Sequence, residues 1–87
     1  MRKTYRAALK QCFYQRLIIT RAEMGITQST MAERLAMDER SYIDLDHGKT
    51  CSSATTLALF LVYVCDDVYG FLEDLRNAFE SETNWAA

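Results

Sequence analysis

The chain has 87 residues, of which 49% are hydrophobic, 25% are charged and none is proline, a composition that excludes two separate domains and a disordered chain. Its formal net charge of -2 excludes a uniformly basic protein, yet residues 1–25 carry six Lys or Arg and one acid, whereas residues 51–87 carry one Arg and six acids. A basic amino-terminal third either attracts phosphate or is a solvated helix face, and composition alone leaves both open.

The first predicted helix covers about residues 3–23. Apolar side chains recur at helical spacing from Tyr5 to Ile18, with charged residues on the other faces. Gly25 then ends the helix, because glycine reaches left-handed dihedrals without steric cost. The sequence therefore begins with an unusually long helix for so small a domain.

Two short helices are predicted next. Thr27 can cap the first, QSTMAERLA, through its side-chain oxygen; Asp38 can cap the second in the same way, and Gly48 ends it. If the two helices cross over a short turn, their apolar residues must all point one way, as in a helix-turn-helix. These residues are Met31, Ala32, Leu35, Met37, Tyr42 and Leu45.

A fourth helix is predicted from the serine pair 52–53 to Val64, and a fifth over residues 68–79, capped by one of the two preceding aspartates. Short connections between short helices are typical of an all-α bundle.

The expected organisation is one domain over residues 1–80, with the helix-turn-helix proper at 28–47 and a flexible polar tail at 81–87.

The segment GITQSTMAERLAMDERSYIDLDHGKT, residues 25–50, resembles the lambda-repressor-like (Cro and Xre type) helix-turn-helix transcriptional regulators. The resemblance extends over about residues 14–75 and implies a five-helix DNA-binding domain, here with an extended first helix. The family places a Gly, a capping polar residue and a Gln before the second helix, and an acid, a variable residue and Gly-Lys after the third. The matching positions are Gly25, Thr27, Gln28, Ala32, Leu35, Asp46, Gly48 and Lys49.

The resemblance implies that the third helix lies in the major groove of DNA. Gln28 is then expected to hydrogen-bond a backbone phosphate, and Lys49 and Thr50 to touch phosphate just beyond the third helix. The outward positions of the third helix, expected to face the bases, are Asp38, Glu39, Arg40, Ile43, Asp44 and His47.

Arg40 is the best candidate for base reading, because its guanidinium can bond both major-groove acceptors of guanine. Glu39 or Asp44 can accept from the amino group of cytosine, and Ile43 can contact a thymine methyl. In the alternative, Arg40 pairs with Asp44 four residues later, which contributes only about 0.3–0.5 kcal/mol. His47 is expected to be a helix-end residue favoured by the dipole rather than a ligand or a base.

By the same resemblance, Asp46 is expected to form a largely buried salt bridge with Arg21 of the first helix. The chain departs from the family at Ala36, where the turn normally has Gly; a left-handed alanine costs about 1–2 kcal/mol.

Leu59 and Val62 also stand where exposed polar residues are usual, so the fourth helix is apolar nearly all round. Such a helix needs a second covering surface. We expect one of two covering surfaces: the extension of the first helix, or a second copy of the chain in a homodimer. The homodimer would form through helix 4 and helix 5 or through that extension. Most of a nearby apolar stripe is expected in the core: Tyr63, Tyr69, Phe71, Leu72, Leu75 and Phe79.

Three cysteines, Cys12, Cys51 and Cys65, lack metal-ligand spacing and are expected to be reduced core thiols. The longest apolar run, LALFLVYVC, is less than half the ~20 residues that span a bilayer, and no signal peptide is recognised. We therefore expect a cytoplasmic protein with no membrane partner.

The leading hypothesis is a sequence-specific DNA-binding transcriptional regulator, a dimeric repressor of prokaryotic or phage type whose partner is double-stranded DNA. The rival is a protein-interaction module on the same fold, antitoxin-like or an accessory subunit. An enzyme is not expected, because no nucleophile is paired with His47 and no phosphate loop or metal motif is present. No cofactor, metal or small-molecule ligand is predicted.

Overall fold

The computed structural model describes residues 2–86, and within that range every regular element is helical. The α-helices are α1 (Arg2–Met24), α2 (Gln28–Arg34), α3 (Glu39–Asp46), α4 (Ala54–Leu59) and α5 (Val68–Ala86), and the π-helical segment η1 (Phe60–Val64) continues α4. The predicted all-α class is confirmed. The molecule is elongated, with extents of 42 × 24 × 19 Å.

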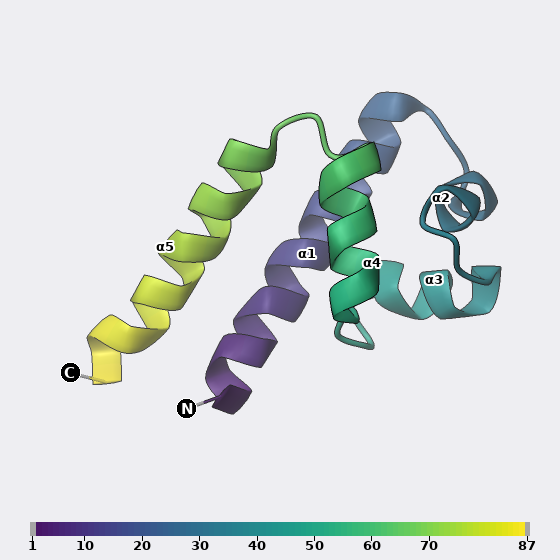
Figure 1. The fold of residues 1–87 in the computed structure, drawn as a ribbon. Coiled ribbons are helices and arrows are strands. Elements are labelled where there is room, and N and C mark those ends of the chain that lie inside the picture. Colours follow the sequence, from purple (N-terminus) through teal and green to yellow (C-terminus); the bar gives the residue numbers. More distant parts are fainter. Residues whose placement is uncertain (1, 87) are drawn as a thin grey trace.

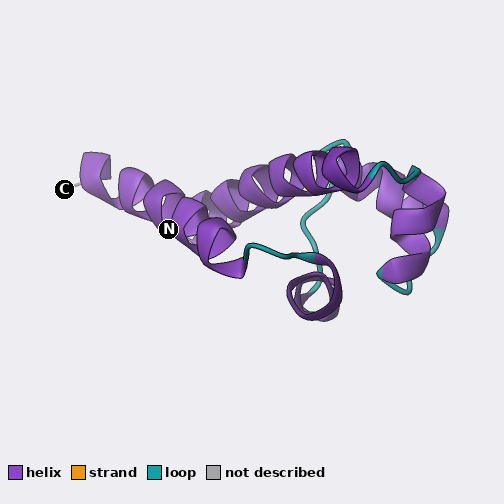
Figure 2. Ribbon diagram, turned by 90° about the horizontal axis from the view of Figure 1, so that it is seen from above, coloured by secondary structure: helices purple, strands orange, loops and turns teal. Residues whose placement is uncertain are grey.

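The long helices α1 and α5 lie side by side and antiparallel, and α2 and α3 occupy the end of the molecule away from the two termini (Figure 1). Aromatic pairs mark the length of the α1–α5 contact: the rings of Tyr5 and Phe79 are 5.2 Å apart, and those of Phe13 and Phe71 are 6.0 Å apart. Viewed from above, α4 is seen end-on and stands beside this pair (Figure 2).

One core joins all the helices. Phe60 of η1 inserts its ring 5.0 Å from that of Phe13 and 5.9 Å from that of Phe71, so three aromatic side chains connect α1, η1 and α5. The α2–α3 end of the core contains the residues predicted to point inward. Met31, Ala32, Leu35, Tyr42 and Leu45 are buried, and Met37 packs partly buried against them.

The predicted caps begin the short helices. Side-chain oxygens of Thr27, Asp38 and Ser53 each accept from the backbone N–H three residues later, at 3.0–3.1 Å. At the start of α5, Asp67 accepts from the N–H of Gly70 at 3.0 Å. Each side chain satisfies an amide that the helix itself leaves open, which explains why these helices begin where they do.

Helix α5 is longer than predicted. It continues past residue 79 to Ala86, through the segment expected to be a tail, and Ala87 lies outside the described residues. No glycine or proline follows Gly70, so nothing in the sequence stops the helix.

The expectation that most of the apolar stripe is core is wrong for three members. Tyr63, Tyr69 and Leu72 are 73%, 88% and 44% exposed. In α5, the face that meets α1 carries Phe71, which is buried, and Phe79, which is half-buried, so Tyr69 and Leu72 lie on other faces. In η1 the buried residues are Phe60 and Val64, and Tyr63 faces away from them. In the described part of the chain, no helix has the length and apolar character that a membrane crossing requires.

Candidate nucleic-acid interface

Helices α2 and α3 are two separate helices joined by a tight turn. Figure 1 shows α2 nearly end-on while α3 lies across the view, so the two cross steeply. The turn is closed by hydrogen bonds from the N–H of Ala36 to Glu33 at 3.1 Å and from that of Met37 to Ala32 at 3.0 Å. Ala36 has a φ of 54°, the only left-handed non-glycine residue in the described range. The chain therefore keeps the left-handed turn despite the Cβ.

A buried carboxylate fixes the angle between the helices. Asp46 of α3, 4% exposed at its side chain, pairs with Nη2 of Arg21 in α1 at 3.4 Å. It also accepts from Nε2 of Gln28 in α2 at 3.1 Å and from the hydroxyl of Tyr42 at 2.9 Å. We call Arg21, Gln28, Tyr42 and Asp46 the Asp46 hub. Burial, and then the hydrogen bond to Asp46, raises the pKa of Tyr42 above its usual value, so its hydroxyl remains a donor.

Two residues of the Asp46 hub are not expected there from the sequence. Gln28 was expected to face phosphate, but its amide is turned inward to Asp46. Tyr42 stands four residues before Asp46, on the same helix face, and that spacing was a usable signal. The salt bridge from Arg21 to Asp46 is present as the resemblance implied.

Asp38 is committed to capping α3. One carboxylate oxygen accepts from the N–H of Ser41 at 3.0 Å and the other from its hydroxyl at 2.8 Å. The hydrogen bond from the Ser41 backbone, and then that from its hydroxyl, lowers the pKa of Asp38. These contacts favour the capping role of Asp38 over a contact with DNA bases.

The outer face of α3 and the segment after it are open to solvent. Glu39, Arg40, His47, Lys49 and Thr50 are exposed, and Ile43 and Asp44 are half-buried.

Arg40 was expected either to face a ligand or to pair with Asp44. Among the described residues, it forms no ion pair with Asp44 or any other acid. Asp44 instead lines a shallow hollow of about 240 Å³ between α3 and the start of α4, together with Ser41 and Thr50. The guanidinium of Arg40 is thus available to an incoming molecule.

Among residues 3–81, whose side chains the structure describes, no three His, Cys, Asp or Glu side chains are grouped to hold a metal ion. Cys12, Cys51 and Cys65 are free and half-buried. Burial raises the pKa of the thiols of Cys12 and Cys65, so neither has the lowered value of a reactive nucleophile.

Comparison of the chain with protein-family models, with curated proteins and with solved structures finds no significant match.

Proposed function

We propose that the protein is a sequence-specific DNA-binding transcriptional regulator with a lambda-repressor-like fold, acting as a dimer that occupies an operator. The observation that carries the proposal is the unpaired, exposed Arg40 on the outer face of a helix whose angle is fixed by the buried Asp46 hub. A recognition helix needs both properties: rigid placement and free donors on its outer side.

In this proposal α3 lies in the major groove. Arg40 bonds guanine through its two parallel N–H groups, and Ile43 contacts a thymine methyl. Glu39 and Asp44 accept from cytosine amines, while guanine and thymine offer them no amino donor in the major groove and leave them to repel phosphate. Lys49 and Thr50, exposed beyond the end of α3, contact the backbone. Specificity therefore comes from favourable pairs and from the repulsion of wrong sequences.

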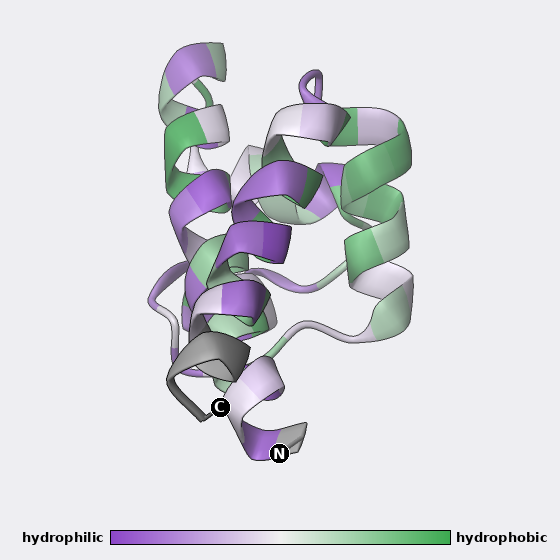
Figure 3. Cartoon of the chain, turned by 90° about the vertical axis from the view of Figure 1, so that its left-hand side faces the viewer, coloured by the Kyte–Doolittle hydropathy of each residue, from purple (hydrophilic) through white to green (hydrophobic). Residues whose placement is uncertain are grey.

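A second copy of the chain is proposed to cover the apolar surface of η1 and α5. Val62, Tyr63 and Tyr69 are each at least 70% exposed. Hydrophobic colouring continues from η1 down into α4 (Figure 3). The extension of α1 is already covered by α5 through Tyr5 and Phe79. A twofold dimer presents two copies of α3 to half-sites about one DNA turn apart.

Selection of bound fragments from a random duplex pool tests the proposal. Arg40→Ala should then weaken binding to the selected duplex by about 1–3 kcal/mol, or roughly 5- to 150-fold, with little change on mixed-sequence duplex. Lys49→Ala should weaken binding to both duplexes. It should also reduce by about 1 the slope of log affinity against log salt concentration, which we call the salt slope.

Arg76→Ala is the matched control, because it removes a cation of α5 that is paired with Glu80 at 3.0 Å. It should leave both affinities unchanged. Failure to enrich any sequence, or equal losses for Arg40→Ala and Lys49→Ala on both duplexes, would reject the assigned roles.

The second candidate is a protein-interaction module, antitoxin-like or accessory. It is favoured by the acids Glu39 and Asp44 on the outer side of α3 and by the exposed ring of Tyr69. A protein that enriches no duplex and shows no salt-dependent binding to mixed-sequence DNA would favour this candidate.

A further inference from the structure

The amino-terminal half of α1 carries three cations on one face. Lys3, Arg6 and Lys10 follow one another at spacings of three and four residues, which places them one above the other on a helix. They line a hollow of about 370 Å³ whose other lining includes Lys49 and Thr50, from the segment that follows α3. We call this hollow the basic groove.

The cations of the basic groove have no acidic partner among the side chains that the structure describes. Among the described residues, neither Lys3, Arg6 and Lys10 nor Lys49 forms an ion pair or a side-chain hydrogen bond. The arginines farther along α1 differ, because Arg16 pairs with Asp74. Four like charges lining one hollow repel one another and create a positive field there, which an anion would relieve.

The basic groove adjoins the hollow between α3 and the start of α4. Thr50 and Cys51 line both the basic groove and the hollow that contains Ser41 and Asp44, so the two hollows meet at these two residues. Lys49, which follows α3 closely, also lines the groove with the cations of α1, so the groove lies next to the end of α3.

The dimensions suit a run of phosphates. Lys3 and Lys10 are seven residues apart on a helix, or about 10 Å at 1.5 Å per residue. One DNA strand has a phosphate about every 3.4 Å along the duplex axis, so this length corresponds to roughly three phosphates.

We propose that the basic groove, lined by Lys3, Arg6, Lys10 and Lys49, is a second phosphate-binding surface that holds the backbone of duplex DNA beside the site read by α3. The inference rests on the proposed function and adds the source of its sequence-independent affinity. Glu39 and Asp44 make α3 itself repel phosphate, and the groove supplies the attraction that α3 lacks.

The triple variant Lys3→Gln/Arg6→Gln/Lys10→Gln tests the groove. Its binding is measured by fluorescence anisotropy with a mixed-sequence duplex of about three helical turns, over a series of salt concentrations. Three lost phosphate contacts should weaken binding on the order of 100-fold at 0.1 M salt and lower the salt slope by about 2–3. The selected duplex should lose affinity by the same factor, because phosphate contacts carry no sequence information.

Two controls separate charge from fold. Lys3→Arg/Lys10→Arg keeps the charge and should keep the affinity. Lys10→Gln and Arg76→Gln each neutralise one helical cation, but only the first lies in the groove, so only Lys10→Gln should lower the slope, by about 1. Circular dichroism checks that each variant is folded.

The outcomes distinguish the groove from the function. If the triple variant binds as the wild type does, while Arg40→Ala and Lys49→Ala keep their effects, the groove is rejected and the function stands. A loss confined to the selected duplex would also reject the groove. If the wild type binds neither duplex, the proposed function fails with it. Stronger wild-type binding to single-stranded RNA of equal length, lost in the triple variant, would assign the groove to RNA instead.

Discussion

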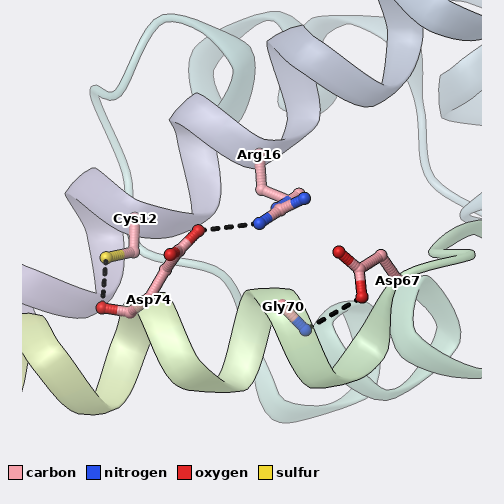
Figure 4. A network of polar contacts seen from close by, with 5 residues as sticks. All are labelled: Cys12, Arg16, Asp67, Gly70 and Asp74. Atoms are coloured by element: carbon pink, nitrogen blue, oxygen red, sulfur yellow. Dashed lines mark hydrogen bonds and ion pairs between the residues drawn. The ribbon is translucent and has the colours of Figure 1, made fainter.

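Two arginines of α1 form ion pairs with different helices, and the pairs differ in burial. Arg16 reaches Asp74 of α5 at 2.7 Å, but that carboxylate is 63% exposed (Figure 4). Arg21 reaches Asp46 of α3 at 3.4 Å, and that carboxylate is 4% exposed. The shorter pair should contribute less to stability, because water screens it, whereas breaking the buried pair strands a charge.

The two regions that contain these ion pairs also differ in the kind of contact that holds them. The α1–α5 region is held by a cluster of aromatic rings, while the α2–α3 region is positioned by the polar Asp46 hub. Apolar packing has no strict direction, but hydrogen bonds fix angles. The region proposed to read DNA is thus the one whose geometry is held by directional contacts.

Removing an aromatic ring should have the largest effect. Phe71→Ala deletes a ring that touches both Phe13 and Phe60 and should lower the free energy of unfolding by about 3–5 kcal/mol. Urea denaturation followed by circular dichroism measures this. Leu72→Ala, the adjacent and 44% exposed residue, is the control and should cost less than about 1 kcal/mol. Equal losses would mean that α5 does not pack through the face described.

Asp46→Asn and Asp74→Asn compare the two ion pairs directly. Asp46→Asn should cost about 2–3 kcal/mol, near the lower end for a buried pair because Arg21 is itself 27% exposed. Asp74→Asn should cost less than about 1 kcal/mol in the same urea titration. A larger loss of stability for Asp74→Asn would show that the distance between the charges, rather than their burial, determines how much an ion pair stabilises the fold.

Tyr42→Phe tests the hub through pH. At neutral pH it should cost about 2 kcal/mol, since a hydrogen bond to a charged acceptor is lost. The pKa of Tyr42 is raised in the folded protein, so its stabilisation is complete below about pH 10, where an unfolded tyrosine titrates, and falls above it. The difference in stability between wild type and variant should therefore narrow between about pH 10 and 11. A constant difference would contradict the raised pKa.

Ala36→Gly should have the smallest effect, and it should be stabilising. Removing the steric strain of a left-handed alanine should raise the free energy of unfolding by about 1–2 kcal/mol. The greater conformational entropy of glycine in the unfolded chain should offset about 0.5–1 kcal/mol of this gain. A net gain of about 0.5–1 kcal/mol is expected as a rise in melting temperature. Ala22→Gly, within α1, is the control and should lower stability by about 1 kcal/mol.

Much of the fold followed from local signals in the sequence. Thr27 and Asp38 were recognised as caps because their side chains act on amides three residues away, and the core of α2 and α3 followed from helical spacing. Tyr63 and Tyr69 were misplaced, since helical period does not tell which of two apolar faces meets a neighbour. The extent of α5 does not follow from the sequence, because the polar residues near its end are also typical of a tail.

The candidate site was predictable in its outward positions but not in its partners. The family resemblance implies that Glu39 and Arg40 lie on the outer side of the third helix, and both are exposed. Whether Arg40 pairs with Asp44 depends on side-chain rotamers, and whether Lys49 lies beside Lys3 depends on how the chain returns past α1. Both contacts depend on tertiary structure, which local sequence patterns do not determine.

The π-helical segment η1 determines the direction in which the chain leaves α4. The N–H of Cys65 bonds to the carbonyl of Phe60, five residues back, at 2.8 Å, so this turn contains one residue more than an α-helical turn. If the same residues wound as a regular α-helix through this turn, the chain beyond it would be rotated by about 100° around the helix axis. Phe71 would then lose its place beside Phe13, so the wider winding of one turn is what lets the carboxy-terminal helix meet the first one.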